Sequence, residues 1–189
     1  MVSTSQLESE FKIGFCGRGL ASHLNAVFAA SDSMPSYGVV AAGGIGYVYK
    51  GKTIDLMGLN NPEMAHANKV KVTGVKNHGS FSKKVFYKQN VDVFLSWPDP
   101  LTDNLNQTDS AALAFLKQLR EPQYFINRVC ANIFNDQEFN ERYSFCRISN
   151  GARHFYGFVK RDWFLSSHPR LQVARLDLPS DSVLLTRKL

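Results

Sequence analysis

Three segments of the sequence place glycine or polar residues at the exit of a predicted strand. They are Gly43-Gly44-Ile45-Gly46-Tyr47, the stretch from Asp55 to Asn61, and Trp97-Pro98-Asp99. In open α/β sheets, ligands bind beyond the carboxyl ends of the parallel strands. If the three strands are parallel, these segments share one edge of the sheet. The sequence therefore predicts a binding site at that edge.

The side chains in and near these segments suit the recognition of a sugar. Aromatic rings offer flat stacking surfaces, and acids, amides and hydroxyls supply the hydrogen bonds that sugar hydroxyls need. The segment Asn77-His78-Gly79-Ser80 also precedes a predicted helix, whose N-terminus is able to hold an anion or a hydroxyl. The candidate ligand-binding residues are Gly44, Tyr47, Asp55, Asn60, Asn61, His66, His78, Ser80, Trp97 and Asp99.

Asp55 has two possible roles that the sequence leaves open. It lies in an apolar strand, where a carboxylate costs free energy unless it is hydrogen-bonded or paired. It either accepts hydrogen bonds from backbone amides of the following loop or points toward a ligand. The same alternative holds for the whole group, whose members could simply stabilise the loops with no ligand bound.

Other site classes lack their motifs. The five histidines show neither HxxxH nor HExxH spacing, so no metal site is predicted. No GxSxG element is present, and the glycines at 43, 44 and 46 match neither dinucleotide-binding nor P-loop spacing. No cofactor is therefore expected, and the chain carries no complete active site.

The composition is that of a globular protein, with 44% hydrophobic and 20% charged residues. A net charge of +6 favours acidic partners, but the basic residues are spread thinly and form no long run. Nucleic acid is disfavoured, because no RNA-binding signature accompanies the aromatic residues near Phe155. Cys16, Cys130 and Cys146 form no CxxC pair, so free buried thiols are expected, with one disulfide possible in an oxidising compartment. No apolar stretch has the length of a membrane helix.

The periodicity predicts the α/β class, with a small, mainly parallel sheet flanked by helices and an α+β last third that ends in an antiparallel hairpin. Asn150-Gly151 is a hairpin signal, and Ser80 is expected to cap a helix. We expect a single domain over 1–179 and a loose tail over 180–189. The predicted helices cover 18–31, 62–68, 81–86, 110–120 and 126–134, and the predicted strands cover 37–42, 53–57, 91–97, 143–149, 153–159 and 171–178.

The segment from Asp55 to Asn61, continuing to His66, resembles a signature of bacterial membrane glycosyltransferases that use lipid-linked sugar donors, including arabinofuranosyl- and mannosyltransferase-like proteins. Their C-terminal soluble domain has a small-residue strand near a glycine and a tyrosine, an Asp-x-x-Gly-Leu-x-Asp loop, a Gly-His or Asn-His element, and a strand that ends in Pro-Asp. The similar parts here are Ala42 to Tyr47, Asp55 to Asn61, Asn77 to Phe81, and Asn90 to Phe94. The likeness covers about half of the chain, roughly residues 18 to 97. Asn60 or Asn61 stands where the family has an acid, and Val91 where it has a proline.

The resemblance implies a non-catalytic, extracytoplasmic (periplasmic) domain, because the catalytic acid of such proteins lies in an early loop that this sequence lacks. Its expected partners are an acceptor glycan or lipid-linked sugar and the membrane-embedded remainder of the same protein. Two other hypotheses remain: a free-standing small-molecule transferase or hydrolase, which would be cytoplasmic, and an interaction module for an anionic partner.

Overall fold

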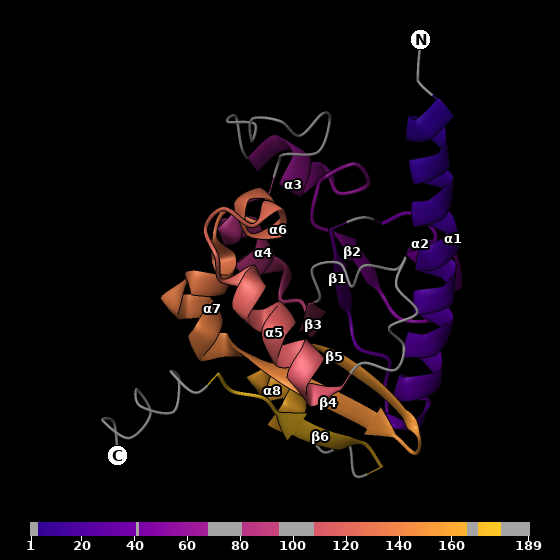
Figure 1. Ribbon diagram of the computed structural model, residues 1–189, viewed down its shortest axis with the longest axis vertical. Coiled ribbons are helices and arrows are strands. Elements are labelled where there is room, and N and C mark those ends of the chain that lie inside the picture. The colour runs from indigo at the N-terminus through magenta and orange to yellow at the C-terminus, as the bar shows by residue number, and fades with distance from the viewer. Residues whose placement is uncertain (1–3, 41, 68–80, 95–107, 166–169, 179–189) are drawn as a thin grey trace.

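The computed structural model describes residues 4–40, 42–67, 81–94, 108–165 and 170–178. In this part of the chain, six strands form one sheet in the order β2-β1-β3-β5-β4-β6 (Figure 1). The strands are β1 (Tyr37–Val39), β2 (Thr53–Asp55), β3 (Val93–Phe94), β4 (Tyr143–Asn150), β5 (Arg153–Lys160) and β6 (Gln172–Arg175).

The sheet has a parallel half and an antiparallel half. β1 lies between β2 and β3 and is parallel to both, whereas β3–β5, β5–β4 and β4–β6 are antiparallel. The predicted α/β class and the C-terminal hairpin are therefore confirmed. The expectation of a mainly parallel sheet is wrong in proportion, since only two of the five pairings between described strands are parallel. Sequence patterns gave no indication that the hairpin joins the sheet through β3.

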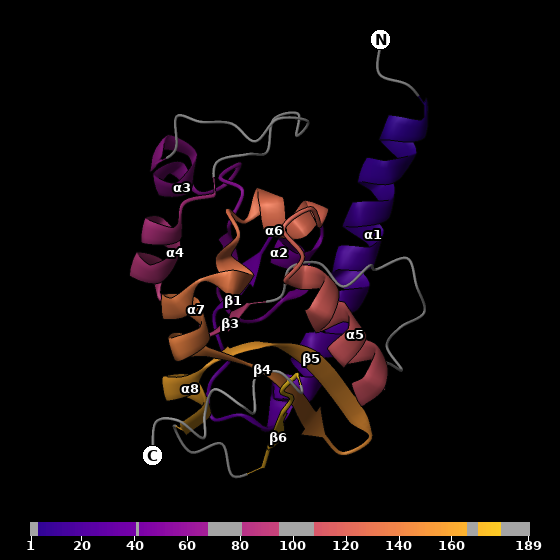
Figure 2. The ribbon, with the colours of Figure 1, turned by 60° about the vertical axis from the view of Figure 1, so that its left-hand side comes forward.

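Helices cover both faces of the sheet (Figures 1 and 2). They are α1 (Thr4–Val27), α2 (Ile45–Val48), α3 (Pro62–Ala67), α4 (Lys83–Gln89), α5 (Asp109–Leu119), α6 (Phe125–Val129), α7 (Gln137–Arg142) and α8 (Arg161–Leu165). Short 3-10 turns follow α1 at Phe28–Ala30 and precede α7 at Ile133–Asn135.

Two hydrophobic clusters lie between the sheet and its helices, one on each face of the sheet. Alternate residues of one strand point to opposite faces, so Phe158 packs with helices α3 to α7 while its neighbour Val159 packs with α1, α2 and α8. Phe94 and Val93 divide in the same way. The first cluster is rich in rings, and Phe94 stacks on Phe134 with centroids 5.7 Å apart. The sheet is thus the middle layer of three.

Helix α1 is much longer than the predicted helix over 18–31. The first part of the helix was missed because a helix is predicted from regularly spaced apolar side chains, and glycine takes a buried position in this part. Gly17 is buried against the turn after β1, and a Cβ added there would lie 2.0 Å from the Gly43 carbonyl oxygen. The helix therefore contacts this turn through its backbone, and a pattern of apolar side chains does not record the contact.

Three smaller differences follow from local chemistry. The helix expected after Ser80 is capped by Ser82, whose hydroxyl accepts from the Val85 amide at 3.4 Å. The hairpin loop is Gly151-Ala152, because Asn150 pairs directly with Arg153, and Gly151 supplies the positive φ of 60°. The short helices α7 and α8 were not predicted, since neither is long enough to show a period. The predicted tail at 180–189 lies outside the described residues.

Asp92 connects the two halves of the sheet. Its carboxylate accepts from both the amide and the hydroxyl of Ser36, at 2.8 and 2.7 Å, and its own amide donates to the Ser36 hydroxyl at 2.9 Å. Its carbonyl accepts from the Lys160 amide at 2.8 Å. The residue before it, Val91, accepts from the Tyr143 hydroxyl at 2.7 Å. The amino ends of β1 and β3 are therefore fixed to the end of β5 and the start of β4.

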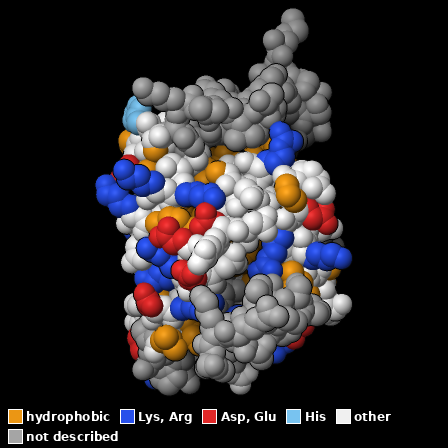
Figure 3. All heavy atoms as spheres, turned by 90° about the vertical axis from the view of Figure 1, so that its left-hand side faces the viewer, with side chains coloured by type: hydrophobic (Ala, Val, Ile, Leu, Met, Phe, Trp, Pro, Cys, Tyr) orange, Lys and Arg blue, Asp and Glu red, His pale blue; other side chains and the backbone are white. Residues whose placement is uncertain are grey.

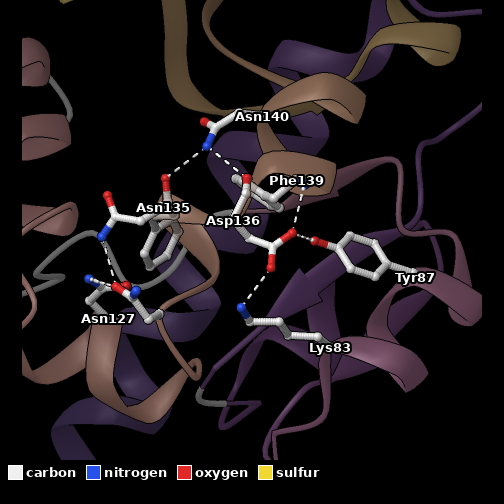
Figure 4. A network of polar contacts seen from close by, with 9 residues as sticks. Lys83, Tyr87, Asn127, Asn135, Asp136, Phe139 and Asn140 are labelled. Carbon is white, nitrogen blue, oxygen red and sulfur yellow. Dashed lines mark hydrogen bonds and ion pairs between the residues drawn. The ribbon is translucent and has the colours of Figure 1, made fainter.

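A second polar network holds α4 against α7 (Figure 4). Asp136, the N-cap of α7, accepts from the Lys83 ammonium at 2.7 Å, from the Tyr87 hydroxyl at 2.8 Å and from the Phe139 amide at 3.3 Å. The Asn140 side chain donates to the Asp136 carbonyl at 2.8 Å. Burial raises the pKa of the Asp136 carboxyl, but these hydrogen bonds outweigh burial and hold the pKa below its ordinary value.

We predict that Asp136 contributes stability that acid removes. A carboxyl whose pKa is lowered by folding stabilises the protein fully above its unfolded pKa of about 3.9, and the contribution is lost as the pH falls through the lower folded pKa. The difference in free energy of unfolding between the wild type and Asp136→Asn should therefore shrink below about pH 4. Urea unfolding between pH 7 and pH 3 measures it, with the exposed Asp32→Asn as the control. A difference that stays constant over this range would contradict the prediction.

The three thiols should react at different rates. Cys130 and Cys146 are free and buried, and burial raises the pKa of both thiols, that of Cys146 to about 12, so little nucleophilic thiolate forms at pH 8. Cys16 is free and only partly buried. We expect a chromogenic disulfide reagent to modify Cys16 first and the other two only as urea unfolds the chain. Rapid reaction of all three without urea would show that the core is open.

Candidate functional site

Two of the three predicted strand exits lie at one edge of the sheet. β1 and β2 are paired in parallel, with Val39 opposite Asp55, so both chains leave the sheet at the same end. β3 runs in parallel on the other side of β1, and its exit points the same way. The residues that follow β3, including the predicted site residues Trp97 and Asp99, lie outside the described residues. The structure therefore gives this edge through the exits of β1 and β2.

Asp55 closes the loop that follows β2. One carboxylate oxygen accepts from the Met57 amide at 2.8 Å and the Gly58 amide at 3.3 Å, and the other accepts from the Asn60 amide at 2.7 Å. The residue is only 6% exposed. Of the two roles that the sequence allowed, the described contacts are those of a carboxylate bound to its own loop.

Asn61 fixes the same loop to two helices. Its side-chain nitrogen donates to the Asp55 carbonyl at 2.8 Å and to the Gln89 side chain of α4 at 3.1 Å. Its side-chain oxygen accepts from the Met64 amide at 3.2 Å, as the N-cap of α3, and from the Gln89 amide group at 3.0 Å. An aspartate here could not donate to the Asp55 carbonyl.

Glycines allow both exits to make close backbone contacts. Gly58 has a φ of 90°, and a Cβ there would lie 2.8 Å from the Ala65 nitrogen of α3. Gly44 has a φ of 81°, and a Cβ would lie 1.9 Å from the Gly14 carbonyl oxygen of α1. Gly44 was predicted as a ligand contact, and it is buried against α1. Its described role is to let the turn after β1 approach the helix.

The side chains that face solvent near this edge are a smaller set. Tyr47, on α2, is 91% exposed, so its ring is accessible for stacking. Asn60 is exposed, and only its backbone amide has a described bond within the loop. His66 is exposed in the last turn of α3. No described bond joins Tyr47 to the Asp55 loop. His78 and Ser80 lie outside the described residues.

One feature of α1 was missed because the helix was expected to begin at residue 18. Phe11 and Phe15 are one helical turn apart, and 77% and 78% of their surfaces are exposed. The signal was the i, i+4 spacing of two phenylalanines. It carries information only once residues 4–17 are recognised as helical.

The described surface carries both positively and negatively charged side chains. On the face with α3, α4 and α7, basic and acidic side chains lie side by side (Figure 3). Ion pairs account for several of them: Lys88 contacts Glu63 at 2.6 Å, and Arg142 contacts Glu138 at 2.7 Å. Among the residues that the structure describes, His, Cys, Asp and Glu do not gather into a group able to hold a metal ion, and no helix is long and apolar enough to cross a membrane.

We predict that Asp55→Ala destabilises the protein by about 2 kcal/mol or more, because three backbone amides lose a charged acceptor in a mostly buried loop. Asn60→Ala is the matched control in the same loop, since its exposed side chain has no described bond, and it should change stability by less than about 0.5 kcal/mol. Urea denaturation measures both. Equal losses of stability in the two variants would show that the Asp55 carboxylate does not hold the loop in place.

Comparison with known proteins adds one relationship. Searches of curated proteins and of solved structures found no match. The model of a domain of unknown function, DUF8728, matches residues 17–173, which include strands β1 to β5 in full and the start of β6. The chain therefore belongs to the DUF8728 domain family.

Proposed function

We propose that this chain is the non-catalytic, extracytoplasmic domain of a membrane glycosyltransferase, and that it contacts the acceptor glycan or the lipid-linked sugar at the carboxyl edge of β1 and β2. The proposal starts from the resemblance of residues 18 to 97 to the soluble domain of such enzymes. The partner of the domain would be the membrane-embedded remainder of the same protein.

The observation that carries the proposal is that some side chains of the loop after β2 hold its backbone while another faces solvent. The Asp55 carboxylate and the Asn61 side chain fix the loop backbone from within, whereas the Asn60 side chain points to solvent. A loop held in this way presents its outer side chains without a large ordering cost on binding. The Asp-x-x-Gly-Leu motif is then a scaffold for the contact surface, and the Asp55 carboxylate is not itself the sugar ligand.

Tyr47 offers the aromatic surface that this mode of binding requires. It is the most exposed of the large hydrophobic side chains that the structure describes. A sugar ring stacked on it would hide apolar surface on both partners, and exposed amides such as that of Asn60 would accept and donate to hydroxyls. Weak binding is expected, because the edge is open and the contacts are few.

The test is the binding of a short-chain polyprenyl phosphosugar in detergent micelles, together with a screen of the protein on a glycan array. Tyr47→Ala should weaken the wild-type interaction about fivefold or more without changing thermal unfolding, since an exposed ring contributes little to stability. Phe164→Ala is the control, because Phe164 is also exposed but belongs to α8, which lies apart from α2 in Figures 1 and 2.

Two results would overturn the proposal. One is the absence of binding to every phosphosugar and glycan tested. The other is an equal loss for Tyr47→Ala and Phe164→Ala, which would indicate non-specific contact of exposed rings with the micelle.

A further inference from the structure

A pocket of about 320 Å³ opens where α5 and α7 meet β4, β5 and β6. It lies away from the edge formed by the exits of β1 and β2. Arg161, in its lining, directly follows Lys160, whose amide bonds to Asp92 immediately before β3. The pocket is therefore near the amino ends of the parallel strands, and the inference drawn from it does not rest on the proposed function.

Three arginines from three different elements reach this pocket. Arg120 comes from the end of α5, Arg161 from the start of α8 and Arg175 from the end of β6. Asp177 is the only acidic residue among the described residues of the lining, and it pairs with Arg175 at 2.8 Å. The described lining thus holds three arginines and one aspartate, so its formal charge is positive.

Arg161 is fixed but not neutralised by the groups that hold it. Its Nη2 donates to the Asn140 carbonyl at 2.9 Å, and its Nε donates to the Ser144 hydroxyl at 3.2 Å. Both acceptors are uncharged, and within the described residues no acid lies within ion-pair distance of this guanidinium. A guanidinium carries five N–H donors, so further donors remain for a ligand. The side chain is thus oriented in advance for an anion.

Apart from Asn135, Asn140 and Ser144, the rest of the described lining is apolar or aromatic. Phe134, Phe145 and Phe158 are buried and line the pocket together with Leu116. The ring centroids of Phe134 and Phe158 are 5.3 Å apart, and those of Phe145 and Phe158 are 5.1 Å apart. An inorganic ion alone would leave this surface unused, whereas an anion that carries an aromatic or short apolar group would cover it.

We propose that this pocket binds a phosphate group carried by a small aromatic or apolar molecule. A phosphate presents several oxygens, and arginine forks bind such oxygens in bidentate pairs. Arg161 provides the oriented donor, the guanidinium groups of Arg120 and Arg175 lie in the same lining, and the phenylalanine side chains receive the organic part. The volume of the pocket is at the lower end of the range for small-molecule sites.

The experiment is isothermal titration calorimetry of the 189-residue chain with phenyl phosphate in 150 mM sodium chloride, beside inorganic phosphate and benzoate. Salt at this concentration screens the general attraction of the +6 chain for anions. We expect phenyl phosphate to bind with a Kd of about 1 mM or tighter. Inorganic phosphate should bind more weakly because it lacks the ring, and benzoate more weakly because it lacks the third oxygen.

Arg161→Gln should weaken the binding of phenyl phosphate about tenfold, the loss expected for a charge-assisted hydrogen bond. Arg153→Gln is the matched control, since it removes the same charge from an exposed position of β5 outside the pocket and should change the Kd less than twofold. Arg175→Gln is a second test that spares the fold, because it breaks only a partly exposed ion pair and should weaken binding severalfold. Circular dichroism checks the fold of each variant.

The proposal is overturned if phenyl phosphate fails to bind the wild type at millimolar concentration. It is also overturned if Arg153→Gln weakens binding as much as Arg161→Gln and Arg175→Gln do, because attraction would then come from net charge alone. Benzoate binding as tightly as phenyl phosphate would assign the pocket to a carboxylate.

Discussion

The junction at Asp92 is the contact on which the rest of the structure depends. β3 (Val93–Phe94) is the strand through which the parallel half meets the antiparallel half. Asp92 strengthens it at one end by exchanging hydrogen bonds with Ser36 before β1 and by accepting from the Lys160 amide at the end of β5. Charge-assisted bonds to a carboxylate are stronger than neutral ones, so a residue just before the strand reinforces the junction at this end.

This junction also explains why the two candidate sites lie apart. The chains of β1 and β3 are held together at their amino ends, where Tyr143 bonds to the Val91 carbonyl and the arginine-lined pocket begins. At the opposite edge the chains leave the sheet, and each exit needs its own support. Asp55 supports the exit of β2 through hydrogen bonds, and Gly44 supports the exit of β1 through contact with α1. The edge at the carboxyl ends of β1 and β2 is therefore formed by loops that are held in place. The edge at the amino ends is formed by side chains from several elements.

The parts of the fold that could be predicted from the sequence are those set by near neighbours. The predicted helices over 62–68 and 110–120 correspond to α3 and α5, and the two runs around Asn150 and Gly151 predicted the hairpin. The start of α1 could not be predicted, because Gly17 packs through its backbone against Gly43 and leaves no apolar stripe. The pairing of β5 with β3 could not be predicted either, since residues 94 and 158 are distant in sequence and no local signal joins them.

The same distinction applies to the sites. Asp55, Asn60 and Asn61 lie within seven residues, so their clustering could be read directly, but their hydrogen bonds could not. A carboxylate that binds a ligand and one that binds its own loop have the same sequence signature, and only the direction of the backbone amides separates them. For the pocket the difficulty is reversed. Arg120, Arg161 and Arg175 have obvious chemistry, but α5, α8 and β6 must be folded before the three charges meet. For a local motif, the sequence thus shows that the residues lie close together but not what they bind. For a site assembled from distant segments, the binding role becomes visible only once the folded structure shows which side chains lie together.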